Sequence, residues 1–167
     1  MTYTDPRSYL YQPGLLDPDA AQRLTREALK ACDDGELYLQ YSATESFGFD
    51  DGRLKMADYS TGSGFGLRGV SGEMTGFSHA NDMSEAAIRR AGETLKLLDP
   101  AKDQPAAPPR KNNRHLYTEG NPLELVPFAQ KVALCQKIDA AARARDPRVA
   151  QVSVSLSGSW TVGEIVR

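Results

Sequence analysis

Alternation of apolar and polar residues between Glu36 and His79 constrains the fold of this chain more than any other sequence feature. A period of two places successive side chains on opposite faces of a strand, so Leu37 and Leu39 lie on one face and Tyr38 on the other. Two turn signals, an Asp-Gly pair and a Ser-Gly-Glu run, divide the stretch and leave no room for a helix. Consecutive strands joined in this way pair antiparallel. The pattern predicts a four-stranded meander whose strands begin near Glu36 and then cover Arg53–Tyr59, Phe65–Val70 and Met74–His79.

A second alternating segment lies at the end of the sequence. Its apolar residues alternate with a row of serines that we expect to face solvent: Ser153, Ser155 and Ser157. After Gly158 the pattern resumes in Trp160–Val162, which indicates a C-terminal hairpin. The strand pattern reaches Arg167 without a turn or polar tail, and an unprotected edge strand exposes unpaired backbone groups. We therefore expect the sequence to be truncated.

Three segments have helical periodicity. The first begins with a cap at Asp17–Pro18 and is expected to end at Gly35, and the second begins at either Asp82 or Ser84. The third runs from about Pro127 to Arg145. Its buried face is expected to carry Phe128, Val132, Cys135, Ile138 and Ala142. Together these elements predict an α+β fold, an antiparallel four-stranded meander packed with helices, plus the C-terminal hairpin.

A proline-rich connection over residues 99–122 separates the second and third helices, and its lack of an apolar period predicts a long exposed segment. Its basic residues, Arg110, Lys111 and Arg114, resemble a phosphate-binding cluster, but a solvated linker is favoured because aromatic residues are not interleaved. The formal charge of -2 over 167 residues gives no positive field for a nucleic acid. No signal-like start or long apolar run is present, so we expect a soluble, cytoplasmic protein with neither nucleic-acid nor membrane partners.

Several residues have the types that carry chemistry, but their contexts favour structural roles. Gly64–Gly69 spells G-x-G-x-x-G, yet strand patterns follow it where a dinucleotide site needs a helix N-terminus. Asp50 and Asp51 form a carboxylate pair suited to acid–base or metal chemistry, but a hairpin turn explains them better. The possible metal ligands lie on separate segments without ligand spacing: Cys32, His79, His115 and Cys135. We therefore assign no catalytic, cofactor-binding or metal-binding residue, and we expect two free cysteines and no bound zinc in the isolated chain.

Two longer runs resemble the amino-terminal region of the TldD/PmbA family of zinc metallopeptidases, also called modulators of DNA gyrase. The first, Leu37–Ser84, contains the stretch GFGLRGVSGEMTGFSHAND, and the second, Ile138–Trp160, resembles the helix and strand that follow. Five glycines match the family pattern, and we assign them turn and packing roles: Gly64, Gly66, Gly69, Gly72 and Gly76.

The resemblance implies a zinc-dependent peptidase that acts on unfolded peptides, in which a TldD-like subunit pairs with a TldE/PmbA-like or identical subunit. The family's HExxxH zinc motif has no counterpart here, since the sequence contains no His-Glu pair. We therefore expect residues 1–167 to be the amino-terminal domain of a longer protein, a non-catalytic scaffold for subunit pairing. The alternative is a freestanding module that binds peptides or proteins by strand addition. Direct binding to DNA or gyrase finds no support in the charge balance.

Overall fold

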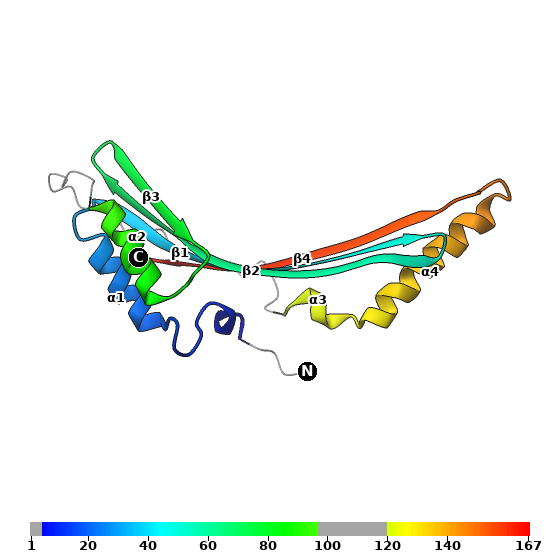
Figure 1. Cartoon of the computed structure of the whole chain (residues 1–167), viewed down its shortest axis with the longest axis horizontal. Helices are drawn as coiled ribbons and strands as arrows, with labels where there is room; N and C mark the ends of the chain where they lie inside the picture. Colours follow the sequence, from blue (N-terminus) through cyan, green and yellow to red (C-terminus); the bar gives the residue numbers. More distant parts are fainter. Residues whose placement is uncertain (1–4, 97–119) are drawn as a thin grey trace. The chain divides into compact units, whose positions relative to one another are not determined.

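The computed structural model describes residues 5–96 and 120–167. Its strands form one sheet in the order β3-β2-β1-β4 (Figure 1). The strands are β1 (Asp34–Asp50), β2 (Arg53–Ser71), β3 (Met74–Ala80) and β4 (Ser153–Val166). The helices are η1 (Pro6–Tyr9), α1 (Pro18–Ala28), α2 (Glu85–Leu95), α3 (Pro122–Leu125) and α4 (Phe128–Arg145). The predicted α+β fold with a four-stranded antiparallel sheet is confirmed.

The sheet is composed differently from the prediction. Arg53–Tyr59 and Phe65–Val70 are parts of one long strand, β2, because the residues between them remain extended. The chain turns at Asp51–Gly52, with φ of 50° and 70°, and at Gly72, with φ of 58°. The predicted C-terminal hairpin is wrong, since Gly158 also remains extended and the whole segment is the single strand β4. This strand pairs beside β1 and is the fourth strand of the sheet.

The chain divides into two units that share the long strands. Unit 1 comprises residues 1–41, 62–119 and 162–167, and unit 2 comprises residues 42–61 and 120–161. Each unit has its own hydrophobic cluster, so each is described by itself. Most of the predicted connection at 99–122 lies outside the described residues, together with His115 and the basic cluster.

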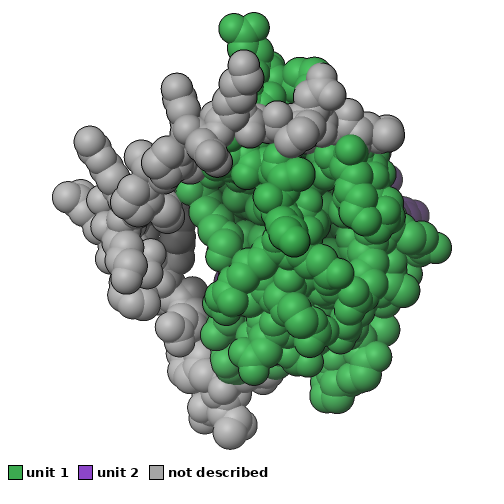
Figure 2. All heavy atoms as spheres, turned by 90° about the vertical axis from the view of Figure 1, so that its left-hand side faces the viewer, with its two compact units in different colours: residues 1–41, 62–119, 162–167 green, residues 42–61, 120–161 purple. Residues whose placement is uncertain are grey.

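In unit 1, α1 and α2 cover one face of the sheet (Figure 1), and Figure 2 shows the surface of this unit in green. Asp17 caps α1 by accepting a hydrogen bond of 2.8 Å from the backbone N–H of Ala20. Of the two candidate caps for α2, Ser84 takes the position and accepts from Ala87 N–H at 3.3 Å, while Asp82 accepts from Ser84 N–H. The core between sheet and helices contains side chains no more than 2% exposed: Leu24, Leu37, Leu39, Leu67, Ile88 and Leu95.

Helix α1 ends at Ala28, earlier than the predicted end at Gly35. Gly35 already belongs to β1, where a Cβ atom would lie 2.4 Å from the backbone oxygen of Arg68. The glycine is therefore needed because β2 passes close to it, and not because a helix ends there. Cys32 consequently lies in the connection between α1 and β1 rather than in a helix.

In unit 2, α3 and α4 lie along one face of the sheet (Figure 1). The hydrophobic cluster joins Cys135 of α4 to Phe47 and Phe49 of β1, with Val154 and Leu156 of β4 packed against it. Odd-numbered residues of β1 therefore face the helices, and even-numbered residues face the other way.

Candidate interaction site

Helix α4 buries only part of the face that its sequence predicts. Lys131, Cys135 and Asp139 are its buried residues, whereas Phe128 and Ile138, expected inside, are 51% and 45% exposed. The other predicted positions do face inward, fully or in part: Val132, Cys135 and Ala142. Two charged residues thus occupy the inner side of the helix.

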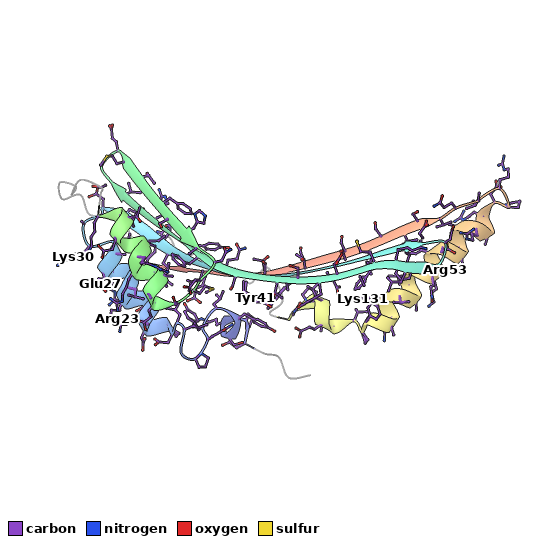
Figure 3. All side chains as sticks on the ribbon, viewed as in Figure 1. Arg23, Glu27, Lys30, Tyr41, Arg53 and Lys131 are labelled. Carbon is purple, nitrogen blue, oxygen red and sulfur yellow. The ribbon has the colours of Figure 1, made fainter. Side chains whose placement is uncertain are left out.

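An ion pair between Lys131 and Glu45 explains the first of these positions. Lys131 Nζ lies 2.6 and 2.7 Å from the carboxylate oxygens of Glu45 and donates to the backbone oxygen of Leu123 at 2.7 Å. Figure 3 labels Lys131 on α4. The two side chains are only 9% and 12% exposed, and the ammonium also lies 5.9 Å from the centre of the Phe47 ring. Because an unpaired charge at such a site is costly, the pair fixes the rotation of α4 against β1.

Arg143 explains the second position. Its Nε donates to Asp139 at 3.1 Å, and its Nη2 donates to Asp51 in the turn between β1 and β2. Hydrogen bonds from the guanidinium to Asp139 and Asp51 raise the pKa of Arg143. The C-terminal half of α4 is therefore tied to the β1–β2 turn by charge-assisted hydrogen bonds.

The adjacent carboxylates lie at the β1–β2 turn, as predicted, but their hydrogen-bond partners are distant in the sequence rather than local to the turn. Asp50 accepts hydrogen bonds from the side chains of Gln151 and Ser153 at 2.9 and 3.0 Å, and these bonds lower the pKa of Asp50. Asp51 accepts from Arg143 and from the backbone N–H of Val152. Both carboxylates hold the start of β4 and the end of α4 against the turn.

Apolar side chains are left on the outside of α3 and α4 because polar ones hold the inside. Leu134 and Ile138 lie one turn apart on α4 and are 48% and 45% exposed. Phe128 leans on Phe47, with ring centres 5.4 Å apart, but half of it remains exposed. We call the whole group the exposed apolar set: Leu125, Val126, Phe128, Leu134 and Ile138. Grouped exposed apolar side chains are typical of protein interaction sites.

The sheet face opposite α4, here called the open face, is mostly polar, with Leu54 and Met56 as exposed apolar side chains near the β1–β2 turn. A Cβ atom at Gly48 would lie 3.6 Å from the Cβ of Met56, so the even-numbered residues of β1 and β2 share this face. The hydrogen bond from Ser153 to Asp50 places the odd-numbered residues of β4 on it as well. The predicted serine row is confirmed as exposed: Ser153, Ser155 and Ser157.

A shallow groove of about 380 Å³ runs across the open face. Side chains from β1, β2 and β4 line it together: Thr44, Ser46, Asp58, Ser60, Ser157 and Ser159. Hydroxyl groups both donate and accept hydrogen bonds, so this groove suits a polar ligand.

Two sheet edges in unit 2 lack a neighbouring strand within the described chain. The outer side of β4 is one, since β4 stands last in the strand order. The other is the Arg53–Thr61 half of β2, because β3 pairs with β2 only from Phe65 to Ser71. Figure 3 marks Arg53 at the start of this half.

The remaining predicted residues take structural places. Gly64–Gly69 lies within β2, so no helix N-terminus follows the glycine motif. His79 lies in β3 with its ring 5.7 Å from that of Phe77, and Cys32 and Cys135 are free thiols. Within residues 5–96 and 120–167, no group of three or more histidine, cysteine or acidic side chains gathers as a metal site. None of the described helices is long and apolar enough to cross a membrane.

Comparison with known proteins gives two matches to one family. Residues 35–97 match the family model PmbA/TldA metallopeptidase domain 1, and residues 121–167 match the PmbA/TldA metallopeptidase central domain. The sequence is 37% identical over 130 residues to a metalloprotease TldD homologue of Buchnera aphidicola from Schizaphis graminum, and 36% identical over 132 residues to that of Haemophilus influenzae. Each alignment covers 77% of this chain but only 27% of the relative, so the chain spans less than a third of these proteins.

Solved structures share the fold. A Bacteroides thetaiotaomicron protein that carries the name modulator of DNA gyrase superposes with a TM-score of 0.63 at 19% identity, over 88% of this chain and 36% of that one. TldE from Thermococcus kodakarensis superposes with a TM-score of 0.56 at 20% identity, over 86% of this chain and 34% of that one.

Proposed function

Because this chain belongs to the PmbA/TldD metallopeptidase family, we propose that residues 1–167 form a non-catalytic amino-terminal domain of a longer peptidase. In this proposal the domain is a scaffold and a pairing surface, and zinc and the catalytic residues belong to another part of the protein. The substrate class is unfolded peptide, the partner is a TldE/PmbA-like or identical subunit, and the location is the cytoplasm.

The exposed apolar set on α3 and α4 is the observation that carries the pairing role. Leu134 and Ile138 present a continuous apolar strip along α4, and the inner face of the helix is already occupied by Lys131 and Asp139. A rotation that buried the strip would break the ion pair with Glu45, so only another surface can cover it. A second subunit is the surface that the family offers.

The pairing role is tested by sedimentation velocity of the 167-residue chain, alone and mixed with a TldE-type subunit. We expect association with one of the two, and we expect Leu134→Glu combined with Ile138→Glu to weaken it at least about 30-fold, the effect of losing a central apolar anchor. Leu15→Glu is the matched control, because Leu15 is 46% exposed but lies in unit 1. A wild-type chain that stays monomeric in both experiments, or equal weakening by the control, contradicts the proposal.

The non-catalytic role has its own test. We expect no zinc-dependent cleavage of an unfolded protein such as casein by the 167-residue chain, and no zinc retained after dialysis against a chelator. Cleavage that requires zinc, or one tightly held zinc per chain, contradicts this part.

A second candidate function, a freestanding module that binds peptide by strand addition, is favoured by the two sheet edges without a neighbour in the described chain. An extended peptide gains main-chain hydrogen bonds from such an edge without any catalytic residue. The two functions are compatible in one domain, since the apolar set and the edges are different surfaces.

A further inference from the structure

The Arg53–Thr61 half of β2 is an edge strand that is open to an added strand. Strand β1 pairs with one side of it, and β3 begins to pair on the other side only at Phe65. Side chains of this half are exposed on both faces of the sheet. Alternate residues of an edge strand direct their backbone N–H and C=O groups outward, which provides a regular row of donors and acceptors.

This half of β2 has few of the features that protect edges. It contains no proline. Its two basic residues, Arg53 and Lys55, stand at the turn end and alternate onto the face that bears α4. The middle of the edge, from Met56 to Thr61, therefore carries no lysine or arginine to repel an incoming basic segment.

The open face beside this edge has a negative charge without a positive partner. In unit 2, its strands place two carboxylates on this face, Asp50 and Asp58. By strand alternation, no lysine or arginine side chain of these strands lies on it. Asp50 accepts hydrogen bonds from Gln151 and Ser153 and also feels the charge of Lys55, whereas the Asp58 carboxylate has no hydrogen-bond or ion-pair partner within the described part of the chain. Asp58 also lines the hydroxyl-rich groove on the same face.

We propose that the Arg53–Thr61 edge captures an extended peptide as an additional strand, and that Asp58 favours a peptide with a basic side chain at the facing position. An added strand would lie about 4.8 Å from β2 and would bring the facing Cβ atom within about 5.5 Å of that of Asp58. An arginine or lysine there pairs with the carboxylate, and its stem lies over the groove lined by Ser46 and Ser60. The inference rests on the proposed function for the nature of the ligand, an unfolded peptide.

Three labelled ten-residue peptides test the proposal by fluorescence anisotropy with the 167-residue chain. The first alternates threonine and valine around a central arginine, the second has glutamine in its place, and the third is the arginine peptide with alternate backbone amides N-methylated. We expect the arginine peptide to bind at least about fivefold more tightly than the glutamine peptide, with a preference that shrinks as salt rises. We expect N-methylation to weaken binding at least about tenfold, because it removes the outward main-chain hydrogen bonds.

Two variants and one mapping experiment locate the site. Asp58→Asn should abolish the preference for arginine while leaving glutamine-peptide binding unchanged, and Asp19→Asn, an exposed carboxylate on α1, should leave the preference intact. Hydrogen exchange should slow in residues 53–61 when peptide is added, and not in β4. The proposal is overturned by undiminished binding of the N-methylated peptide, by an arginine preference that survives Asp58→Asn, by protection of β4 alone, or by no binding of any probe.

These outcomes are independent of the pairing role. Asp58 is not part of the exposed apolar set, so Asp58→Asn should leave sedimentation unchanged. Failed peptide binding with intact association rejects the edge site alone, whereas failed association with intact peptide binding rejects the pairing role alone.

Discussion

Replacing Lys131 by methionine tests how α4 is held on the sheet. The variant keeps a long side chain but leaves the Glu45 carboxylate, 12% exposed, without the ammonium 2.6 Å away. Breaking a fully buried pair costs about 3–5 kcal/mol, and the slight exposure of both groups lowers our expectation to about 2–4 kcal/mol of unfolding free energy. The Leu123 carbonyl also loses its donor, which adds to the cost.

Urea denaturation followed by tryptophan fluorescence measures this loss, because the single tryptophan, Trp160, lies in unit 2. The double variant Lys131→Met with Glu45→Leu removes both charges and should recover stability to within about 1 kcal/mol of wild type, since an apolar pair can replace a buried ion pair. Lys137→Met, on the exposed side of the same helix, is the control and should change stability by less than about 0.5 kcal/mol. A single variant as stable as the control, or a double variant no better than the single one, refutes the reasoning.

Two further predictions concern the sheet. Hydrogen bonds from Gln151 and Ser153 lower the pKa of Asp50, so its contribution to stability is present above the unfolded pKa of about 3.9 and is lost as pH falls through the lower folded pKa. Carboxyl carbon-13 NMR titration should show the Asp50 midpoint rise in Gln151→Ala, and an unchanged midpoint contradicts the assigned cause. Gly35→Ala should cost about 1–3 kcal/mol in urea denaturation, because its Cβ would lie 2.4 Å from a backbone oxygen. Gly48→Ala in the same strand, with its nearest contact at 3.6 Å, should cost less than about 0.5 kcal/mol, and equal costs would contradict the close approach.

The strands could be predicted from the sequence where local chemistry decides them. The alternation that includes Leu37 and Leu39 indicates a strand with one face buried against helices. Asp51–Gly52 supplies the positive φ angles that a tight turn requires. Gly158 was interpreted as the turn of a hairpin because glycine is common both in turns and where a strand is closely approached by another segment. Gly158 remains extended, and a Cβ there would lie 2.7 Å from the side chain of Leu123, so packing under α3 explains it.

The rotation of α4 could be predicted from the sequence only in part. Cys135 was expected on the buried face and lies there, but periodicity alone does not show that Asp139 is buried in place of its neighbour Ile138. The choice is made by Lys131 with Glu45, which lie on elements far apart in the sequence. A lysine in a helix normally indicates a solvent-facing position, and only the structure shows that its partner is buried with it.

The free half of β2 was missed for a related reason. Once Arg53–Tyr59 and Phe65–Val70 were treated as separate strands, each was expected to have neighbours on both sides. A single strand of this length outruns its partner β3, which pairs only from Phe65. The edge at β4 was visible in the sequence because its stretch from Ser153 to Val162 alternates without a charged residue or proline.

Unit 2 links its own stability to association. Its inner helix face is stabilised by the Lys131–Glu45 pair and by Arg143, while Leu134 and Ile138 remain in water. Apolar area that is buried only in a complex contributes to stability only in proportion to the population of that complex. The thermal midpoint of unit 2, read from Trp160, should therefore rise with protein concentration or with added partner, and Leu134→Glu should remove the rise. A midpoint independent of concentration and partner would mean that the apolar strip is tolerated in solvent and has no partner to bury it.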